Sequence, residues 1–463
     1  MCYKIKLMKY RRLLTLLAIA TALPSCNLFQ RKIKLNQLTT PKVKKIVREN
    51  NFEMSNLTYK SYMAFARKFT SYIMEVNNNE DEKSLGISIP DAYLCLAISG
   101  VISDDEARND VLAYLELNNM DELRTAVKEM IATLATLMKN SEGKNVGGYN
   151  LNSVWFNPDK VELLKEKDEQ LYKDLEEIFD ASLFMETLTS AKANQYMKDN
   201  GLKDMPAPEI KLDDNDPDAI NVMSAYYCLD YFEPDMKETY KNEYKNGNHK
   251  MDYYLNNNES KVDYIHRKSL TQVYKNDNFY GSTMDVGNVL SMSFFLPNDK
   301  EAMPSSILKD VIDDNYEIKQ SSYIDYDNVE RPTTLHSVNI QAPYFSLNNE
   351  SELTRGDLAK ILPVITGKGA GERIARAFEG PMHLDYIKQF SVMKFNYDGF
   401  YSCSVTISGM IPESAIFDPE YERFDLILDH PYVFKVNKGI KVGSDFHKVP
   451  LVIGEIVNPE YKD

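Results

Sequence analysis

The order of periodic segments along this 463-residue chain limits its fold more than any other feature. Apolar residues recur at three- and four-residue steps over Asn56–Val76, and Pro90–Ser99 is apolar nearly all round, so both segments are predicted helices. Runs rich in β-branched and aromatic residues dominate the second half. Because no repeat and no long Pro- or Gly-rich linker divides the two halves, the sequence predicts one α+β domain over 51–463.

Capping signals and charge patterns predict further helices. Ser103-Asp-Asp-Glu106 matches a capping box that would open a helix to about Leu117. Asp121 is predicted to cap a long helix over Glu122–Lys139, and the charged run Lys160–Ile178 is predicted to be helical as well. Strands are predicted at Tyr149–Phe156, Asn221–Asp230, Asp285–Leu296, Leu335–Leu347, Val392–Asn396, Leu426–Lys435 and Pro450–Val457.

The charge balance excludes one class of partner. The chain carries 54 basic and 69 acidic residues, a net charge of −15. Affinity for nucleic acid comes mainly from clustered Lys and Arg, so no nucleic-acid partner is expected. An acidic globular body, monomeric in solution, is the simpler interpretation.

The N-terminal residues have the pattern of a targeting segment. A basic head precedes the apolar run Leu13–Leu23, which is shorter than the roughly 20 residues that a membrane span needs. Leu23-Pro24-Ser25-Cys26 resembles a bacterial lipobox, and an ordinary secretory signal is the alternative. The lipobox interpretation gives a signal peptide over 1–25, a lipid-anchored Cys26 and a tether over 26–50. It predicts export across the inner membrane and anchoring to the cell envelope by lipid alone, on the periplasmic side or at the cell surface.

No motif for catalysis or for a bound metal or cofactor stands out. The five cysteines form no C-x-x-C, and the six histidines form no H-E-x-x-H. The glycine-rich run Gly367–Arg373 lacks the Lys-Ser/Thr ending of a phosphate-binding loop. An enzyme would have to rely on acidic pairs such as Asp213/Asp214 or Asp313/Asp314, which lie in turn-like polar runs. We therefore expect no enzyme, no metal and no cofactor.

Several strings in the right order give the chain a resemblance to a known family. Asp429-His-Pro-Tyr-Val-Phe434 resembles D-R-P-F-L-F of the serpins, and Val452-Ile-Gly-Glu-Ile-Val-Asn-Pro459 resembles their F-M-G-R-V-V-D-P. Leu290–Pro297, Asn152–Phe156 and Ala342–Ser346 match shorter family strings. The resemblance covers essentially 51–463. It implies N-terminal helices packed on a large central mixed β-sheet, further smaller sheets and an exposed reactive loop.

Two departures from the family pattern bear on mechanism. In the string Ser224–Phe232, Phe232 stands where serpins usually have a tryptophan, so an aromatic packing role is kept. Near the opening of the sheet, Gly86-Ile-Ser-Ile-Pro90 replaces a Ser-Pro and Gln389 stands at the position of a histidine. The resemblance therefore leaves open whether the hydrogen bonds that let the sheet part are rebuilt or weakened.

The segment after Gly399 has the alternation of a strand. Successive residues of a strand face opposite sides, so the residues of one set would turn inward if the segment entered a sheet: Phe400, Ser402, Ser404, Thr406 and Ser408. All but the first are small and would not overpack a filled core. Forcing the larger Phe400 into a packed site costs roughly 1–3 kcal/mol. Gly399, Phe400 and Ser402 are thus the predicted hinge, and the alternative is a loop held by Phe400 that never inserts.

The resemblance implies a function and a bond to be cut. Serpins trap an endopeptidase that cleaves the loop, by inserting the cleaved loop as a strand. Their spacing from the glycine selects Glu413-Ser414 as the reactive bond, and Met410 or Arg423 are alternatives because the segment around 417–423 is longer than usual. Pro412 disfavours helix and holds the backbone extended there. The target would be a serine or cysteine endopeptidase, and the second hypothesis is a binding protein of the same fold whose loop does not insert.

Overall fold

The computed structural model describes residues 37, 53–77, 83–164, 168–202, 205–246, 250–256, 258–325, 328–403 and 420–461. All of them belong to one compact unit, Asn36–Asp463. Within these ranges, no helix has the length and apolar character needed to span a membrane.

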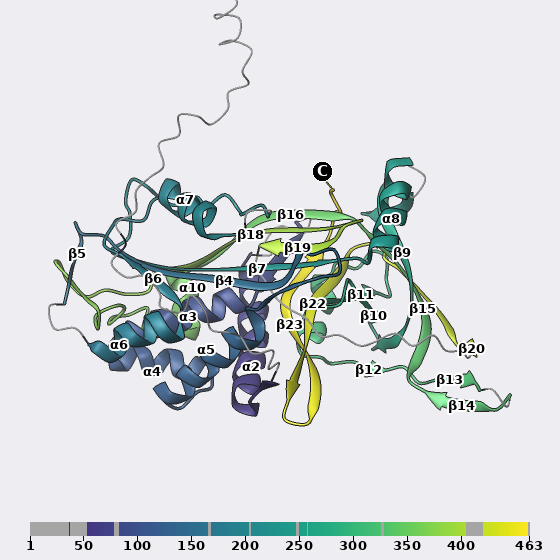
Figure 1. Cartoon of the computed structure of the whole chain (residues 1–463), viewed down its shortest axis with the longest axis horizontal. Helices are drawn as coiled ribbons and strands as arrows, with labels where there is room; N and C mark the ends of the chain where they lie inside the picture. The colour runs from purple at the N-terminus through teal and green to yellow at the C-terminus, as the bar shows by residue number, and fades with distance from the viewer. Residues whose placement is uncertain are drawn as a thin grey trace, which may run out of the picture. The chain divides into compact units, whose positions relative to one another are not determined.

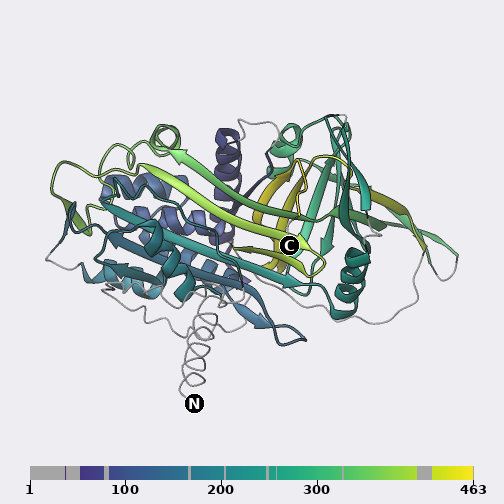
Figure 2. The ribbon, with the colours of Figure 1, turned by 90° about the horizontal axis from the view of Figure 1, so that it is seen from above.

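Two large sheets form the frame of the fold (Figure 1). The seven-stranded sheet has the order β16 (Phe345–Thr354), β18 (Tyr386–Asn396), β19 (Gly399–Cys403), β7 (Ile220–Tyr231), β4 (Asn145–Phe156) and β3 (Leu137–Lys139), with β6 (Ala181–Phe184) beside β4. It is mixed, because β6 runs parallel to β4 while the other neighbours are antiparallel. Figure 2 looks down on this sheet and shows the light-green β16 and β18 beside the teal β7 and β4.

The eleven-stranded sheet contains the C-terminal strands. Its order is β2 (Leu85–Ser88), β23 (Asp445–Ile456), β22 (Tyr432–Val442), β11 (Ser291–Pro297), β10 (Phe279–Asp285), β9 (Asn258–Lys275), β15 (Leu335–Pro343) and β21 (Arg423–Ile427). Three short strands also pair with this sheet: β1 (Glu53–Met54) with β22, and β8 (Lys250–Leu255) and β12 (Glu317–Ile318) with β9. Two smaller sheets pair β14 (Glu330–Thr333), β13 (Ser321–Ile324) and β20 (Glu420–Tyr421), and β17 (Ala375–Ala377) with β5 (Val161–Leu163).

The N-terminal helices cover one face of the seven-stranded sheet, and α7 lies on the other (Figure 1). The helices are α2 (Asn56–Asn77), α3 (Pro90–Val101), α4 (Asp105–Tyr114), α5 (Met120–Leu134), α6 (Glu169–Lys173), α7 (Ser190–Asn200), α8 (Pro234–Asn246), α9 (Ser305–Ile312) and α10 (Arg355–Ile361). The predicted apolar stripe of α2 is buried as expected: Phe65 packs edge-on against Tyr93 of α3 and Tyr114 of α4. The Tyr226 hydroxyl of β7 donates to the Leu134 carbonyl and ties the sheet to α5.

Two predicted helices need correction at their ends. The cap of α4 is Asp104, which accepts the Ala107 N–H at 2.8 Å, because the Ser103 hydroxyl instead donates to the Ser99 carbonyl of α3. The helix ends at Tyr114, short of Leu117. The cap of α5 is Asn119 rather than Asp121, and Leu137–Lys139 is strand β3 because it pairs with β4.

Other corrections concern segments that form sheet pairs with distant partners. Within the predicted helix Lys160–Ile178, Val161–Leu163 pairs with β17, and among the described residues of this range Glu169–Lys173 alone is α-helical, before a π-helical turn at Asp174–Ile178. Asp285–Leu296 is divided between β10 and β11, which form an antiparallel pair. Leu335–Leu347 is divided between β15 and β16 in different sheets, and Leu426–Lys435 between β21 and β22.

Candidate functional site

The predicted hinge lies inside the seven-stranded sheet. Gly399, Phe400 and Ser402 all belong to β19, which is hydrogen-bonded to β18 on one side and to β7 on the other. Gly399 is opposite Asn396 and Tyr231, and Ser402 is opposite Met393 and Cys228. The segment is therefore a central strand at its start, with neighbours on both sides.

Gly399 occupies a position that only glycine fits. Its φ is +140°, a conformation that L side chains rarely adopt. A Cβ added there would lie 2.2 Å from the Asp230 carbonyl oxygen. One residue earlier, the Asp398 carbonyl accepts the Phe232 N–H at 3.0 Å, so the turn into β19 is fixed against the end of β7. The glycine of the predicted hinge is thus required for steric reasons.

The two sides of β19 differ in burial as the alternation predicts. The side chains of Phe400 and Ser402 are 1% and 0% exposed, whereas Tyr401 is half-buried. Phe400 pairs with Phe395 of β18, whose ring lies 6.3 Å from that of Phe232. Phe232 is buried and packs edge-on against Tyr240 of α8, as the aromatic role predicted for it requires. The large side chain of Phe400 lies in the core, between two strands and not at a sheet edge.

A buried carboxyl adjoins the entry point of β19. Asp230 pairs with Phe400 and is 2% exposed, and its Oδ2 accepts the N–H groups of Val289 and Leu290 at 2.8 Å. Burial raises the pKa of Asp230 to about 7, against the opposing effect of these backbone donors. The carboxyl thereby holds the turn between β10 and β11 against β7. Asp230 was not among the residues predicted from the sequence, although an acid at the end of the otherwise apolar run Tyr226–Leu229 was a possible signal.

Beyond β19 the two flanking strands border a cleft. Residues 221–226 of β7 and 386–390 of β18 line a cavity of about 120 Å³, together with Asp91, Ala92 and Cys95 of α3. In the described part of the chain, β7 and β18 are joined through β19 and share no ladder of their own. We call this cavity the insertion cleft.

A polar network closes the inner side of the insertion cleft. The Gln389 Nε2 donates to the Ser88 carbonyl at 2.8 Å and to Asp91 Oδ2 at 3.2 Å, and its Oε1 accepts the Ser88 N–H at 2.9 Å. The Ser88 hydroxyl completes the network by donating to Asp91. Burial raises the pKa of Asp91 to about 7. The amide of Gln389, which stands where the resemblance implies a histidine, is thus hydrogen-bonded to Ser88 and to the buried carboxyl of Asp91.

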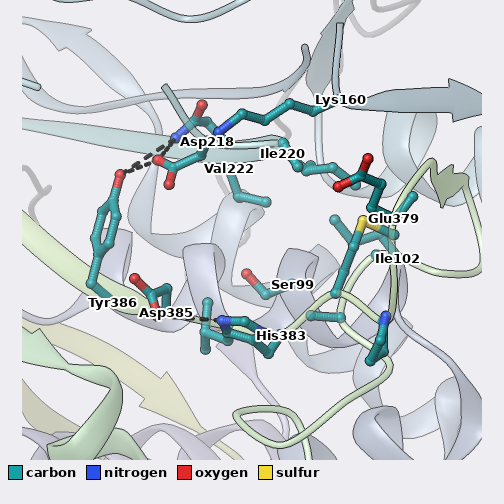
Figure 3. Close-up of a pocket in the computed structure, with 18 of the residues that line it drawn as sticks. Ser99, Ile102, Lys160, Asp218, Ile220, Val222, Glu379, His383, Asp385 and Tyr386 are labelled. Atoms are coloured by element: carbon teal, nitrogen blue, oxygen red, sulfur yellow. Dashed lines mark hydrogen bonds and ion pairs between the residues drawn. The ribbon is translucent and has the colours of Figure 1, made fainter. Parts of the chain in front are cut away.

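A larger cavity of about 750 Å³ lies at the far end of the insertion cleft, where both strands begin (Figure 3). Ile102, Ile220 and Val222 give it an apolar wall, whereas Lys160 and Glu379 are polar. At the same end, the Tyr386 hydroxyl donates to Asp218 Oδ2 at 2.5 Å, and the Asn221 Nδ2 donates to the same oxygen at 2.7 Å. Tyr386 is the first residue of β18 and Asp218 precedes β7, so this contact bridges the two strands.

The remaining predicted residues divide into two groups. Cys26, Met410, Glu413 and Ser414 lie outside the described residues. Arg423 is described: it is exposed and is the first residue of β21, opposite Ser337 of β15. The extra length around it contains β20, whose Tyr421 stacks on Tyr323 of β13 at 5.2 Å.

In each acidic pair that was considered as a catalytic candidate, one residue has a structural partner. Asp314 pairs with Lys435 at 2.7 Å, and Asp214 accepts the Ser190 N–H at 2.8 Å at the start of α7. Burial raises the pKa of the Cys95 thiol to about 12, which disfavours the reactive thiolate. In the ranges that the structure describes, no cluster of His, Cys, Asp and Glu is arranged to hold a metal ion.

Comparison with solved structures identifies the fold. The native state of tengpin, a thermophilic serpin, is 15% identical, and the match covers 92% of this chain and 100% of tengpin with a TM-score of 0.60. Arabidopsis AtSerpin1 in its native stressed conformation is 16% identical over 88% of this chain and 99% of its own, also with a TM-score of 0.60. Serpin48 of the insect Tenebrio molitor is 14% identical over 87% and 98%, with a TM-score of 0.57. No family model matches the chain, and no curated protein matches its sequence.

The chain therefore has the serpin fold, and the predicted fold class is confirmed. The large mixed sheet and the further sheets agree with these neighbours. At 13–16% identity the likeness concerns the fold alone, so activity has to be argued from the site.

Proposed function

We propose that the chain is a serpin-type inhibitor that traps a serine or cysteine endopeptidase by inserting its cleaved loop into the seven-stranded sheet. The observation that carries this proposal is the position of β19 between β7 and β18, with the insertion cleft between the same two strands beyond the end of β19. Nothing in this mechanism requires the chain to be an enzyme or to hold a cofactor.

The register of β19 supports insertion of the residues that follow it. If the loop continued both ladders, Thr406 would lie opposite Gln389 and Ser224, and Gly409 opposite Tyr386 and Asn221. Because β18 begins at Tyr386 and β7 at Ile220, the two strands offer pairing partners for a continuation of about that length. Backbone groups of both strands along the cleft would then gain hydrogen-bond partners, which is the driving force of strand addition.

The side chains of the loop suit the same register. Phe400 and Ser402 already face the core, so Ser404, Thr406 and Ser408 would face it too. Thr406 would meet the network of Gln389, Ser88 and Asp91, where its hydroxyl can donate and accept hydrogen bonds. Small inward residues fill a strand-wide gap without overpacking it.

The trap requires one covalent step. The serine hydroxyl or cysteine thiol of the protease attacks the Glu413 carbonyl, the peptide bond to Ser414 breaks, and Ser414 leaves as a protonated amine. The acyl-enzyme on Glu413 is then carried toward the far end of the sheet as the loop inserts. Distortion of the protease would prevent water from releasing it.

A protease panel tests the proposal most directly. We expect a complex that survives SDS, with a new N-terminus at Ser414; a terminus after Met410 or Arg423 would move the reactive bond to one of those residues. Thr406→Arg changes a side chain that would face inward and should abolish the complex. The matched variant Ile407→Arg changes a side chain that would face outward and should retain it. Cleavage without any stable complex would overturn the inhibitory mechanism.

The burial of Phe400 is the observation that favours the second hypothesis, a binding protein of the same fold whose loop does not insert. A large side chain already held in the core can anchor the loop at its start. Nicking the loop separates the two hypotheses, because an added central strand raises the melting temperature. An unchanged melting temperature after complete nicking would favour the non-inserting protein.

We further propose that Cys26 carries a lipid that anchors the mature protein to the cell envelope after export across the inner membrane. The support is the lipobox-like string that ends at Cys26. Mass spectrometry of the mature N-terminus should find a diacylglyceryl thioether on Cys26, and Cys26→Ser should release the protein from membranes. We propose a monomer facing the periplasm or the cell surface, which sedimentation and protease shaving of intact cells would test.

A further inference from the structure

Three short strands form a small sheet at the point where the described chain resumes after residue 403. Strand β20 (Glu420–Tyr421) pairs with β13, and β13 pairs with β14. We call these three strands the side sheet. Figure 1 shows it projecting from the body, far from α4 and α6. The side sheet therefore lies directly beside the C-terminal end of the loop that carries the proposed reactive bond.

Polar contacts hold the side sheet against the large sheet. The Lys319 Nζ lies 2.7 Å from Glu422 Oε1, and the Ser321 hydroxyl donates to Glu422 Oε2 at 3.2 Å. The Glu422 carbonyl accepts the Ser337 N–H of β15 at 2.9 Å, and the Val273 carbonyl of β9 accepts the Lys319 N–H at 2.8 Å. A surface that is already held in place loses less entropy when a partner binds to it. The side sheet is therefore a preorganised surface.

One face of the side sheet carries a row of aromatic and basic side chains. Tyr421 of β20 lies opposite Tyr323 of β13, which lies opposite Arg331 of β14. The two tyrosine rings are stacked, with centroids 5.2 Å apart. The Arg331 side chain pairs with Asp325 and is still 52% exposed. We call Tyr421, Tyr323 and Arg331 the tyrosine face; tyrosine and arginine are enriched among the residues that contribute most to protein–protein binding.

The side sheet has no buried side of its own. All residues of β13 and β14 are described, and none of them is buried. On the face opposite Tyr323, the Ile324 side chain is exposed as well. A small sheet gains stability of its own by burying a hydrophobic face. The tyrosine face is therefore open to a partner.

The covalent chain determines which partner comes close to the side sheet. Glu420 follows Ser414 by six residues, and six residues span at most about 22 Å. A folded enzyme of about 200 residues has a radius of gyration of roughly 16 Å. An endopeptidase seated on the Glu413-Ser414 bond thus extends over the same distance. The part of its surface next to the subsites for the residues after the cut would meet the side sheet.

We propose that the tyrosine face is a second binding surface for the endopeptidase that cuts the loop. The inference rests on the proposed function, in which an endopeptidase attacks the loop, and goes beyond it by assigning a specificity-determining surface outside the reactive bond. The complementary patch on the enzyme offers aromatic or aliphatic groups to the two rings and a carboxylate or carbonyl oxygen to the guanidinium. The side sheet would thus select among enzymes that accept the same bond.

Cleavage kinetics of the full chain test the tyrosine face. The probe is the endopeptidase of the panel that cuts residues 404–419 fastest, and the readout is kcat/KM for that cut, with its position verified by mass spectrometry. We expect Tyr323→Ala and Arg331→Ala each to lower kcat/KM about tenfold. Tyr323→Phe should stay near wild type because it keeps the ring. The matched control Ile324→Ala removes a side chain from the opposite face of the same strand and should leave kcat/KM unchanged.

The other outcomes separate this inference from the proposed trap. If wild type forms no stable complex while Tyr323→Ala and Arg331→Ala slow the cut, the trap fails and the tyrosine face stands. If all variants are cut at the wild-type rate, the tyrosine face is overturned, whether or not the complex forms. If Ile324→Ala slows the cut as much as Tyr323→Ala, the loss belongs to the whole side sheet, and the assignment to the tyrosine face is overturned. A wild-type chain that no enzyme of the panel cuts would overturn both proposals.

Melting temperatures separate docking of the enzyme from folding and from insertion. The uncut Arg331→Ala variant should melt near wild type, because the side chain that it removes is exposed and lies outside the two large sheets. Its rise in melting temperature after complete nicking should equal that of wild type. A slower cut with both values unchanged places the effect of Arg331 in the encounter with the enzyme. A slower cut with a lower melting temperature of the uncut chain would instead assign Arg331 a structural role and overturn its place in the tyrosine face.

Discussion

The two ends of the region between β7 and β18 are stabilised by different kinds of contact. At the entry, β19 is already paired on both sides, and buried aromatic residues hold it: Phe400, Phe395 and Phe232. Along the insertion cleft and at its far end, the walls meet through polar contacts, namely the Gln389–Asp91–Ser88 network and the Tyr386–Asp218 hydrogen bond. One end is fixed by close packing, and the other by hydrogen bonds.

The difference indicates how a strand could be added in steps. Removing a buried aromatic ring lowers the free energy of unfolding by several kcal/mol, so the packed residues at the entry favour one arrangement. A hydrogen bond contributes a net of only about 0.5–1.5 kcal/mol and can be exchanged for another one. The entry therefore fixes the register, while the cleft can rearrange its contacts as residues are added.

Removing the ring of Phe400 should have the largest effect. Phe400→Ala would leave a cavity between β7 and β18 and lower the free energy of unfolding by about 3–5 kcal/mol, measured by urea denaturation. Phe378→Ala is the matched control, because that side chain is 60% exposed and should cost about 0.5 kcal/mol or less. Equal losses of stability for the two variants would show that the packing of Phe400 does not stabilise the entry.

Gly399→Ala should come next. The alanine Cβ would be strained at φ +140° and would meet the Asp230 carbonyl oxygen, so we expect a loss of at least about 1–3 kcal/mol. Gly380 has φ +73° with nothing within 4 Å of an added Cβ, so Gly380→Ala measures backbone strain without the steric contact. A Gly399 variant no worse than this control would show that the close approach to Asp230 is unimportant.

Asp91 should make stability depend on pH in a defined direction. Its pKa is raised from 3.8 to about 7 in the fold, so the folded state binds the proton more tightly and is favoured at low pH. The contribution is complete below about pH 4 and is lost as the pH rises through about 7, at up to about 1.4 kcal/mol per pH unit.

Asp91→Asn should therefore flatten the pH profile of the free energy of unfolding between about pH 4 and pH 7, without changing it elsewhere. Asp230→Asn should flatten the same window, because burial raises the pKa of Asp230 to about 7 as well. An unaltered slope for Asp91→Asn would mean that the network of the cleft does not titrate.

The ion pair beside the hinge should have the smallest effect. Lys237 and Asp398 are 2.7 Å apart, with side chains 14% and 37% exposed. Lys237→Gln should cost about 1 kcal/mol or less, and less still at high salt. Lys68→Gln, in the more exposed pair with Glu116, should cost about nothing under the same conditions. A loss comparable to that of Phe400→Ala would mean that charge, not packing, fixes the entry.

Much of the local structure followed from the sequence. The helices α2 and α3 were predicted almost to their ends, because the apolar periodicity of α2 and the nearly all-apolar run of α3 each lie within one segment. The division of Asp285–Leu296 into two strands was not predicted, since the turn there is held by Asp230, about sixty residues away. Strand β5 was missed for the same kind of reason, because its partner β17 lies more than two hundred residues further along the chain.

The sequence by itself determined the alternation after Gly399, the need for glycine at the pivot and the resemblance that named the fold. Strand periodicity and backbone sterics act along the chain itself, whereas the carbonyl that an added Cβ at Gly399 would meet belongs to the distant residue Asp230. Only the tertiary structure decided that Phe400 lies in the core, that Gln389 binds Ser88 and Asp91, and that Tyr386 meets Asp218. Those contacts join residues 168 or more positions apart, and no local pattern encodes a partner chosen by folding.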